Sequence, residues 1–335
     1  MQQLPSMLVD RFGRRVDYVR LSITDRCDFR CVYCMTEHMT FAPKREVLSL
    51  EELAQVAQAF TELGVSKIRL TGGEPLIRSD MLSLVRRLGR LPGLEELALT
   101  TNGSQLQRMA GDLRSAGVTR VNVSLDSLRP RRFRQLTRHG SLDQVVAGID
   151  AAIAAGFAGV KINAVILKGR NDDEVLDLVD FACQRDIDVA FIEEMPLGRI
   201  VEHDRLLSFC SSAELRATIG RRYQLAPLGE PQGNAGPARY YSLRGQRSRV
   251  GFISPHSSNF CHLCNRVRVT AQGRLLLCLG NEHSVDLRAL LRGPHYTPAD
   301  LRDALVAAMA IKPERHQFTL QGEPEILRFM NMTGG

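Results

Sequence analysis

Short segments rich in β-branched residues alternate with helical stretches through residues 18–194, and this alternation limits the fold more than any other feature. Six segments are predicted to be strands, at residues 18–23, 67–71, 97–101, 120–125, 161–167 and 189–194. The stretches between them predict helices, one of which begins with a capping box at Ser49 and Glu52 and ends at Gly64. A βα repeat of this kind predicts parallel strands joined by crossover helices.

Several predicted strands carry polar side chains on one face and apolar side chains on the other. The polar positions are Arg20, Ser22, Lys67, Arg69, Thr71, Asn122, Ser124, Lys161 and Asn163. Because crossover helices must cover the apolar faces, the polar faces look inward, as in a barrel or partial barrel with a hydrated lumen. Cations that face one another there need an anion among them, so we expect a multiply charged ligand. The alternative is that each cation is paired with a carboxylate.

The pattern changes after about residue 225. Residues 227–237 are rich in Gly and Pro and predict a loop. Two hairpins are expected beyond it, 239–243 with 248–253 and 266–270 with 275–279, followed by two short helices. We therefore expect a partial barrel over residues 1–225 and a C-terminal α+β segment over residues 226–335.

The eight cysteines need an explanation, because a chain of 335 residues can bury a large core without disulfides. Cys27, Cys31 and Cys34 follow the first strand with the spacing C-x3-C-x2-C. Thiolates favour zinc or iron–sulfur over magnesium or calcium. A structural zinc site normally has four ligands, so three on one loop indicate a cluster with one iron left open.

A second group of three cysteines, Cys261, Cys264 and Cys278, has the spacing C-x2-C-x13-C. Zinc ribbons also begin with C-x2-C, and a zinc ion here could be completed by a histidine, the candidates being His256, His262 and His283. Two trios in one chain favour two incompletely ligated clusters. The remaining cysteines, Cys183 and Cys210, lie in apolar surroundings and are expected to be buried thiols.

The chain carries 44 basic and 37 acidic residues, a net charge of +7 that suits an anionic partner. No run of eighteen apolar residues occurs, and the start lacks the apolar core of a signal peptide. We therefore expect a cytoplasmic protein without a membrane partner. The basic run at residues 129–138 predicts an exposed helix face. Nucleic-acid binding is the alternative, disfavoured because no aromatic stacking platform accompanies the run and the chain has no tryptophan.

Cysteines, polar residues and glycines follow the carboxyl ends of the predicted parallel strands. In parallel barrels this rim is where active sites are formed. These segments are the first cysteine trio, the turn 71–75 (TGGEP), and residues 100–103, 124–127 and 195–196. Farther along, Arg266 and Arg268 are two positions apart on a predicted strand just past Cys264, so they share a face. Guanidinium groups suit phosphate.

These motifs carry a resemblance to known enzymes. The segment CDFRCVYC, from Cys27 to Cys34, resembles the signature of radical S-adenosylmethionine (SAM) enzymes, and the GGEP turn is their second hallmark. The second trio, with residues 251–255, the segment 264–268 and the Gly-Gly end, resembles the GTP 3′,8-cyclase family of molybdenum cofactor biosynthesis. The resemblance implies an α/β fold, an incomplete (β/α)6 TIM-type barrel closed by a C-terminal α+β segment that carries a second cluster.

The resemblance also implies a set of site residues. Each cysteine trio would hold a [4Fe–4S] cluster, and the open iron of the first would bind SAM. The positions that match SAM contacts are Tyr33, Gly73, Ser124 and Met195. Those that match GTP contacts are Arg20, Arg69, Thr100, Lys161, Arg266 and Arg268. The positions expected to take part in catalysis are Arg20, Arg266, Arg268, Gly334 and Gly335.

The implied reaction abstracts H3′ from GTP, joins C3′ to C8 of guanine, and gives 3′,8-cyclo-7,8-dihydro-GTP. The implied partners are an electron donor such as flavodoxin or ferredoxin and the downstream cyclic pyranopterin monophosphate synthase, and a homodimer remains open. One departure is Ala190, where many relatives carry a phosphate-binding arginine. Two alternatives are a radical SAM peptide-modifying enzyme with an auxiliary cluster and a zinc-stabilised nucleic-acid-binding protein.

Overall fold

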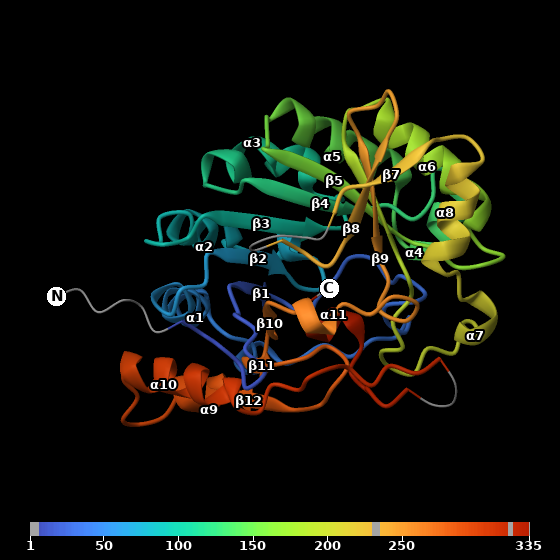
Figure 1. Cartoon of the computed structure of the whole chain (residues 1–335). Helices are drawn as coiled ribbons and strands as arrows, with labels where there is room; N and C mark the ends of the chain where they lie inside the picture. Colours follow the sequence, from blue (N-terminus) through green and yellow to red (C-terminus); the bar gives the residue numbers. More distant parts are fainter. Residues whose placement is uncertain (1–6, 230–234, 321–323, 335) are drawn as a thin grey trace.

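The computed structural model describes residues 7–229, 235–320 and 324–334. Within these ranges, twelve strands hydrogen-bond into one curved sheet in the order β12-β11-β10-β1-β2-β3-β4-β5-β6-β9-β8-β7 (Figure 1). The helices lie mainly on one side of this sheet. The loop expected at residues 227–237 falls partly on residues 230–234, which lie outside the described ranges.

The centre of the sheet is made of six parallel strands, as the βα repeat predicts. They are β1 (Tyr18–Ser22), β2 (Lys67–Thr71), β3 (Glu96–Thr101), β4 (Arg120–Ser124), β5 (Gly159–Val165) and β6 (Asp188–Ile192). Each predicted strand is confirmed to within two residues at either end. The outward-facing side chains, among them Val19, Ile68 and Val121, are fully buried under the crossover helices, because each strand alternates apolar and polar positions.

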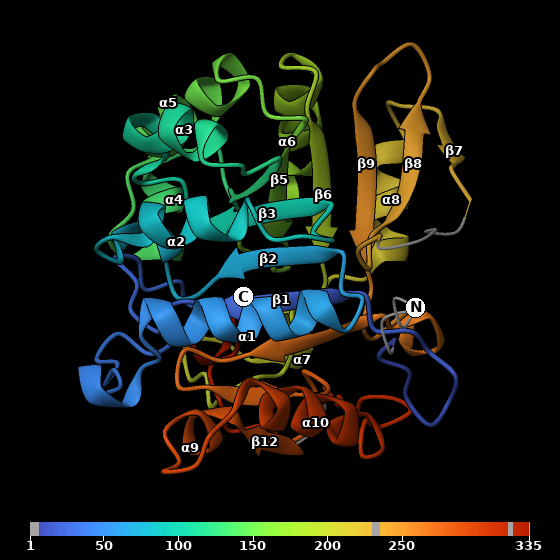
Figure 2. The ribbon, with the colours of Figure 1, turned by 90° about the vertical axis from the view of Figure 1, so that its left-hand side faces the viewer.

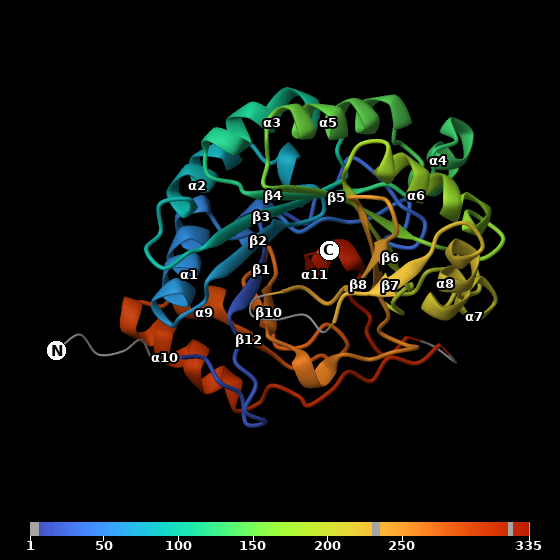
Figure 3. The same cartoon turned by 45° about the horizontal axis from the view of Figure 1, so that its top comes forward.

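The crossover helices cover the convex face of the sheet (Figure 3). They are α1 (Leu50–Glu62), α2 (Met81–Leu88), α3 (Leu106–Ser115), α4 (Pro130–Thr137), α5 (Leu142–Ala154) and α6 (Val175–Cys183). The predicted start of α1 is confirmed, since the Ser49 side chain accepts from the Glu52 backbone and Glu52 accepts from the Ser49 backbone. The helix stops before Gly64, whose φ of +83° is readily adopted only by glycine.

The C-terminal part extends the same sheet at both edges. β9 (Arg249–Ile253) pairs with β6 and β10 (Arg266–Val269) pairs with β1, both in parallel. Outside them lie, on one side, β8 (Arg239–Leu243) and β7 (Leu225–Pro227) and, on the other, β11 (Arg274–Leu276) and β12 (Ser284–Asp286). Both predicted hairpins are confirmed. In the described part of the chain the sheet is not closed by hydrogen bonds, because β7 and β12 are its two ends, so the barrel is incomplete.

The remaining helices pack around this frame. They are α7 (Arg205–Ser208), α8 (Ser212–Gly220), α9 (Leu287–Leu291), α10 (Pro298–Met309) and α11 (Met330–Thr333). Figure 2 shows α10 beside α1, and ion pairs of Arg292 with Glu52 and of Arg302 with Glu62 join the C-terminal helices to α1. The short helix α11 lies within the concave side of the sheet (Figure 3), where Asn331 donates to the carbonyl of Asp25.

Candidate active site

A single cavity of about 590 Å³ fills the concave side of the sheet. Both cysteine trios line it, so the two groups that lie more than 200 positions apart in sequence share one space. The lining thiols are Cys27, Cys31, Cys34, Cys261, Cys264 and Cys278. The prediction that both trios face a common chamber is therefore confirmed as geometry. In the described ranges no three His, Cys, Asp or Glu side chains are arranged around a single ion; in a [4Fe–4S] cluster each thiolate binds its own iron.

The first trio sits on the long loop after β1, and the glycine pair after β2 supports that loop. A Cβ on Gly73 would lie 2.3 Å from the carbonyl oxygen of Arg26, and one on Gly72 would lie 2.6 Å from that of Thr24. The Gly73 amide donates to Thr24 and the Glu74 amide to Arg26. The sequence predicted glycines for close approach to a ligand, which stays a prediction, and the structure shows in addition that they let the cysteine loop pack against the turn.

Glu74 completes this support from a fully buried position. Its carboxylate accepts from the backbone of Leu76, from the backbone of Asn102 at 2.6 Å and from the hydroxyl of Thr101 at 2.7 Å. Burial raises the pKa of Glu74 to about 7 despite these donors. The side chain therefore ties the end of β2 to the end of β3 directly beneath the first trio.

Burial raises the pKa of all three thiols in the first trio, and nearby carboxylates add to the effect. Glu74 acts in this way on Cys27, and Asp126 acts on Cys31. Burial raises the pKa of Cys34 to about 12. Without a metal these thiols stay protonated. The negative charge near them comes from the carboxylates, and it favours a positively charged occupant.

The second trio has the opposite electrostatic surroundings. The antiparallel pairing of β10 with β11 places Arg268 opposite Leu276, which brings the chain before β10 alongside the chain after β11 and hence Cys264 towards Cys278. Burial alone would raise the pKa of Cys264, but Arg266 and Lys312 outweigh it and lower the pKa to about 7. The charges that act most strongly on the thiols therefore differ, with carboxylates acting on Cys27 and Cys31 and cations acting on Cys264.

The polar strand faces look into the cavity, as predicted, and they carry donors without partners. Arg20 Nε and Arg266 Nε are buried and unsatisfied, and both side chains line the cavity. Burial and then the neighbouring Arg268 lower the pKa of Arg20 far below its usual range. Burial tends to raise the pKa of Tyr18, yet the cations around it, led by Arg69, lower it to about 7. Such a space favours an anion.

Two of the predicted cations have partners, and only the partner of Lys67 reduces the positive potential. Lys67 pairs with Glu96 at 3.0 Å, so the carboxylate alternative holds for that residue. Arg69 donates to the hydroxyl of Tyr18 at 2.7 Å and to Thr100 at 3.4 Å, which orients its guanidinium without neutralising it. The ligand expectation therefore rests on the arginines of β1 and β10 rather than on β2.

Eight further predicted site residues also line the cavity. Its lining includes Tyr33, Gly73, Ser124, Met195, Arg69, Thr100, Lys161 and Arg268. Gly334 has a φ of +81°, a Cβ there would lie 2.7 Å from the Thr71 hydroxyl, and its carbonyl accepts from Arg268. Gly335 lies outside the described residues. Ala190 is fully buried between Asn163 and Gly251 in the sheet, and the cavity wall beyond it carries Arg249 and Tyr240.

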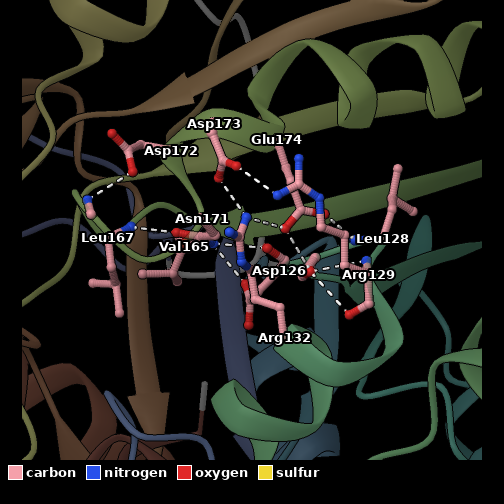
Figure 4. Close-up of polar contacts among 12 residues, drawn as sticks. Asp126, Leu128, Arg129, Arg132, Val165, Leu167, Asn171, Asp172, Asp173 and Glu174 are labelled. Atoms are coloured by element: carbon pink, nitrogen blue, oxygen red, sulfur yellow. Dashed lines mark hydrogen bonds and ion pairs between the residues drawn. The ribbon is translucent and has the colours of Figure 1, made fainter.

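A buried network at the ends of β4 and β5 was not predicted from the sequence. Tyr33 donates to Asp126 at 2.7 Å, and the backbone of Val165 donates to the same carboxylate. Asn171 donates to the carbonyls of Asp126 and Val165 and accepts from the Leu167 amide. Figure 4 shows the contacts of Asn171 beside Asp126. The network holds Tyr33, and with it the first cysteine loop, against two strand ends.

The basic run at residues 129–138 contributes to the same region. Arg129 and Arg132 pair with Asp173, and Arg132 also reaches Glu174 at 2.7 Å (Figure 4). The buried Glu174 carboxylate accepts in addition from the Ser127 hydroxyl. The run is solvated, as expected of a helix face, but it also fastens α4 to the segment that leads into α6.

Comparisons with known proteins agree with this geometry. Residues 21–182 match the model of the radical SAM superfamily, and residues 187–318 match that of Molybdenum Cofactor Synthesis C. The solved structure of Streptococcus suis SuiB bound to S-adenosylmethionine is similar with a TM-score of 0.63 and 14% identity, covering 96% of this chain and 79% of that one. This likeness shows the fold, and the chain is a radical SAM protein.

Curated relatives narrow the family. The GTP 3′,8-cyclase of Marinobacter nauticus is 60% identical over 328 residues, 98% of each chain. That of Pseudomonas entomophila is 60% identical over 336 residues, the whole of both chains. This protein belongs to the GTP 3′,8-cyclase family. No helix within the described residues is long and apolar enough to cross a membrane.

Replacement of Asn171 by alanine should destabilise the protein, because it leaves two carbonyls and one amide without their partners in a fully buried place. We expect a loss of about 3 kcal/mol in the free energy of unfolding, measured by urea denaturation of the metal-free protein. Gln107→Ala, at an exposed position of α3, should change it by less than about 0.5 kcal/mol. Equal effects of the two changes would contradict the role given to the network.

Cys264 of the second trio and Cys34 of the first should differ in thiol reactivity when no metal is bound. Thiolate forms as the pH rises through the pKa, so alkylation of Cys264 should rise near pH 7, whereas Cys34 should remain thiol until about pH 12. Mass spectrometry of peptides after brief iodoacetamide treatment at several pH values measures this order. In urea the two onsets should coincide near pH 8.5. A common onset in the folded protein would refute the difference in surroundings.

Proposed function

We propose that this protein converts GTP into 3′,8-cyclo-7,8-dihydro-GTP, the first step of molybdopterin biosynthesis. The observation that carries the proposal is the division of one cavity by charge. Carboxylates lie near the first cysteine trio and arginines near the second. SAM is a sulfonium cation and GTP is a polyanion, so each ligand matches one end of the cavity.

The donor sets fit the cofactors of this reaction. Cys27, Cys31 and Cys34 would hold a [4Fe–4S] cluster with one open iron, and the second trio would hold another. The residues proposed to contact SAM are Tyr33, Gly73, Ser124 and Met195. When bound, the first cluster with SAM supplies the reductive cleavage that produces a 5′-deoxyadenosyl radical. The chain itself orients the reactants and keeps water away from them.

Positioning of GTP falls to the cationic strand faces. Arg20 Nε and Arg266 Nε are buried donors without partners, and hydrogen bonds to the triphosphate would satisfy both. Arg69 and Lys161 are held by the hydroxyls of Tyr18 and Tyr240, so they present oriented charges to the same ligand. Arg268 and Thr100 complete the proposed GTP contacts, and the two C-terminal glycines are proposed to reach the reacting centre.

The wider setting follows from this chemistry. We propose a one-electron donor such as flavodoxin or ferredoxin, transfer of the product to cyclic pyranopterin monophosphate synthase, and a place in the cytoplasm. The division at residues 225 and 226 and a homodimer stay predictions. The peptide-modifying and nucleic-acid-binding alternatives have no observation in their favour, since the relatives at 60% identity are named GTP 3′,8-cyclase.

Anaerobic reconstitution should load about eight irons per chain if both trios carry cubane clusters. With SAM and a reductant, 5′-deoxyadenosine should form only when GTP is present, as measured by liquid chromatography. Cys27→Ala should abolish this product. A folded preparation with zinc and no sulfide, or radical formation retained in the Cys27→Ala protein, would end the proposal.

Replacement of Arg266 by alanine should weaken GTP binding, because it removes a buried charged donor. A charge-assisted hydrogen bond contributes roughly 1.5–3 kcal/mol, so KM for GTP should rise by about ten- to a hundredfold. Steady-state kinetics at saturating SAM measure the change. Arg131→Ala, at an exposed position of α4, is the control. Equal KM values for the two proteins would count against a contact between Arg266 and GTP.

A further inference from the structure

Lys312 is a charged side chain buried almost completely, with 1% of its surface exposed. It follows α10 on a short turn, and nothing in the sequence marked it as a site residue. Among the residues that the structure describes, no carboxylate pairs with it in an ion pair. An unpaired buried ammonium costs several kcal/mol, so its charge needs a partner of another kind.

The atoms that Lys312 reaches belong to the second cysteine trio. Its Nζ lies 3.6 Å from Sγ of Cys264 and 3.2 Å from the carbonyl oxygen of Leu277, the residue before Cys278. One ammonium group therefore links the segment before β10 to the segment after β11, the two segments that carry Cys264 and Cys278. The groups there that can carry the opposite charge are the cysteine thiolates.

The backbone around Lys312 is fixed to Cys261, the first cysteine of the trio. Arg14, held by Asp10 at 2.6 Å, donates to the carbonyl of Cys261 at 2.8 Å and to those of Pro313 and Glu314. The guanidinium thus clamps the turn that carries Lys312 against the first cysteine of the C-x2-C pair. Placement of the ammonium is built into the fold rather than left to a flexible side chain.

We propose that Lys312 is the counter-ion of the second cluster, a positioning residue that donates a hydrogen bond to the Cys264 thiolate and raises the reduction potential of that cluster. The inference rests on the proposed function, because it requires a [4Fe–4S] cluster at the second trio. Net charge and hydrogen bonds to the sulfurs are the levers by which a protein sets such a potential. Carboxylates rather than cations act on Cys27 and Cys31 of the first trio, so the two clusters would differ in potential.

The test isolates the second cluster in the full-length chain. The parent carries Cys27→Ala, Cys31→Ala and Cys34→Ala, so that only the second trio binds iron, and Lys312→Met, Lys312→Gln and Lys312→Arg are added to it singly. Lys168→Met removes the same charge from an exposed side chain that pairs with Glu214 and serves as the control. Each protein is reconstituted anaerobically, and iron, sulfide and the EPR-monitored midpoint potential are measured.

We expect the parent and Lys168→Met to bind four irons with one midpoint potential. Lys312→Met should show a lower midpoint potential, or fewer irons where the cluster no longer assembles. Lys312→Gln keeps a hydrogen-bond donor but removes the charge, so the midpoint potential of its cluster should also be lower. The midpoint potential of Lys312→Arg should equal that of the parent. If Lys312→Met does not fold, the ordering of the Gln and Arg proteins decides in the same way.

Unchanged iron content and midpoint potential in Lys312→Met or in Lys312→Gln would overturn the counter-ion role and leave the proposed function intact. A parent that binds no iron at all would overturn both, since the second cluster would then be absent. A fall in potential shared by Lys168→Met would trace the effect to net charge and not to contact with Cys264, and would likewise overturn the assignment.

Discussion

Positive charge concentrated on the concave face of the sheet is the constraint on which this structure depends. Arg20, Arg266 and Arg268 crowd the concave face of the sheet, and burial with mutual repulsion lowers the pKa of Arg20 and Arg268, the latter to about 10. The apolar faces of the same strands are fully buried under the crossover helices, and their burial offsets this electrostatic cost. The strain is relieved when a ligand of the opposite charge enters.

The cavity is polarised as well as charged. Carboxylates act on two thiols of the first trio and cations on Cys264 of the second, and a low dielectric strengthens both effects. Two ligands of opposite charge can then be sorted by position without a large contact surface for each. The same polarity bears on the metal centres, because a cluster responds to the charges within a few ångströms of its sulfurs.

The sequence predicted the parts of the site that depend on local pattern. The inward faces of the strands follow from the alternation of side chains, which also places Arg20 and Lys161 in the lumen. The start of α1 follows from the capping-box motif at Ser49 and Glu52. Lys312 and Asn171 were missed because their roles depend on contacts made across the fold, where no short motif announces them. The glycine pair was found, but its packing against Thr24 and Arg26 required coordinates.

The pairing of β1 with β10 also bears on how the chain is made. β1 pairs with β2 and with β10, and β10 is synthesised only when the ribosome reaches residues 266–269. Until then the other edge of β1 lacks its native partner strand. Contacts between such distant segments form slowly because of the entropy of loop closure. Until then the concave side of the sheet lacks the wall that β10, β11 and β12 form.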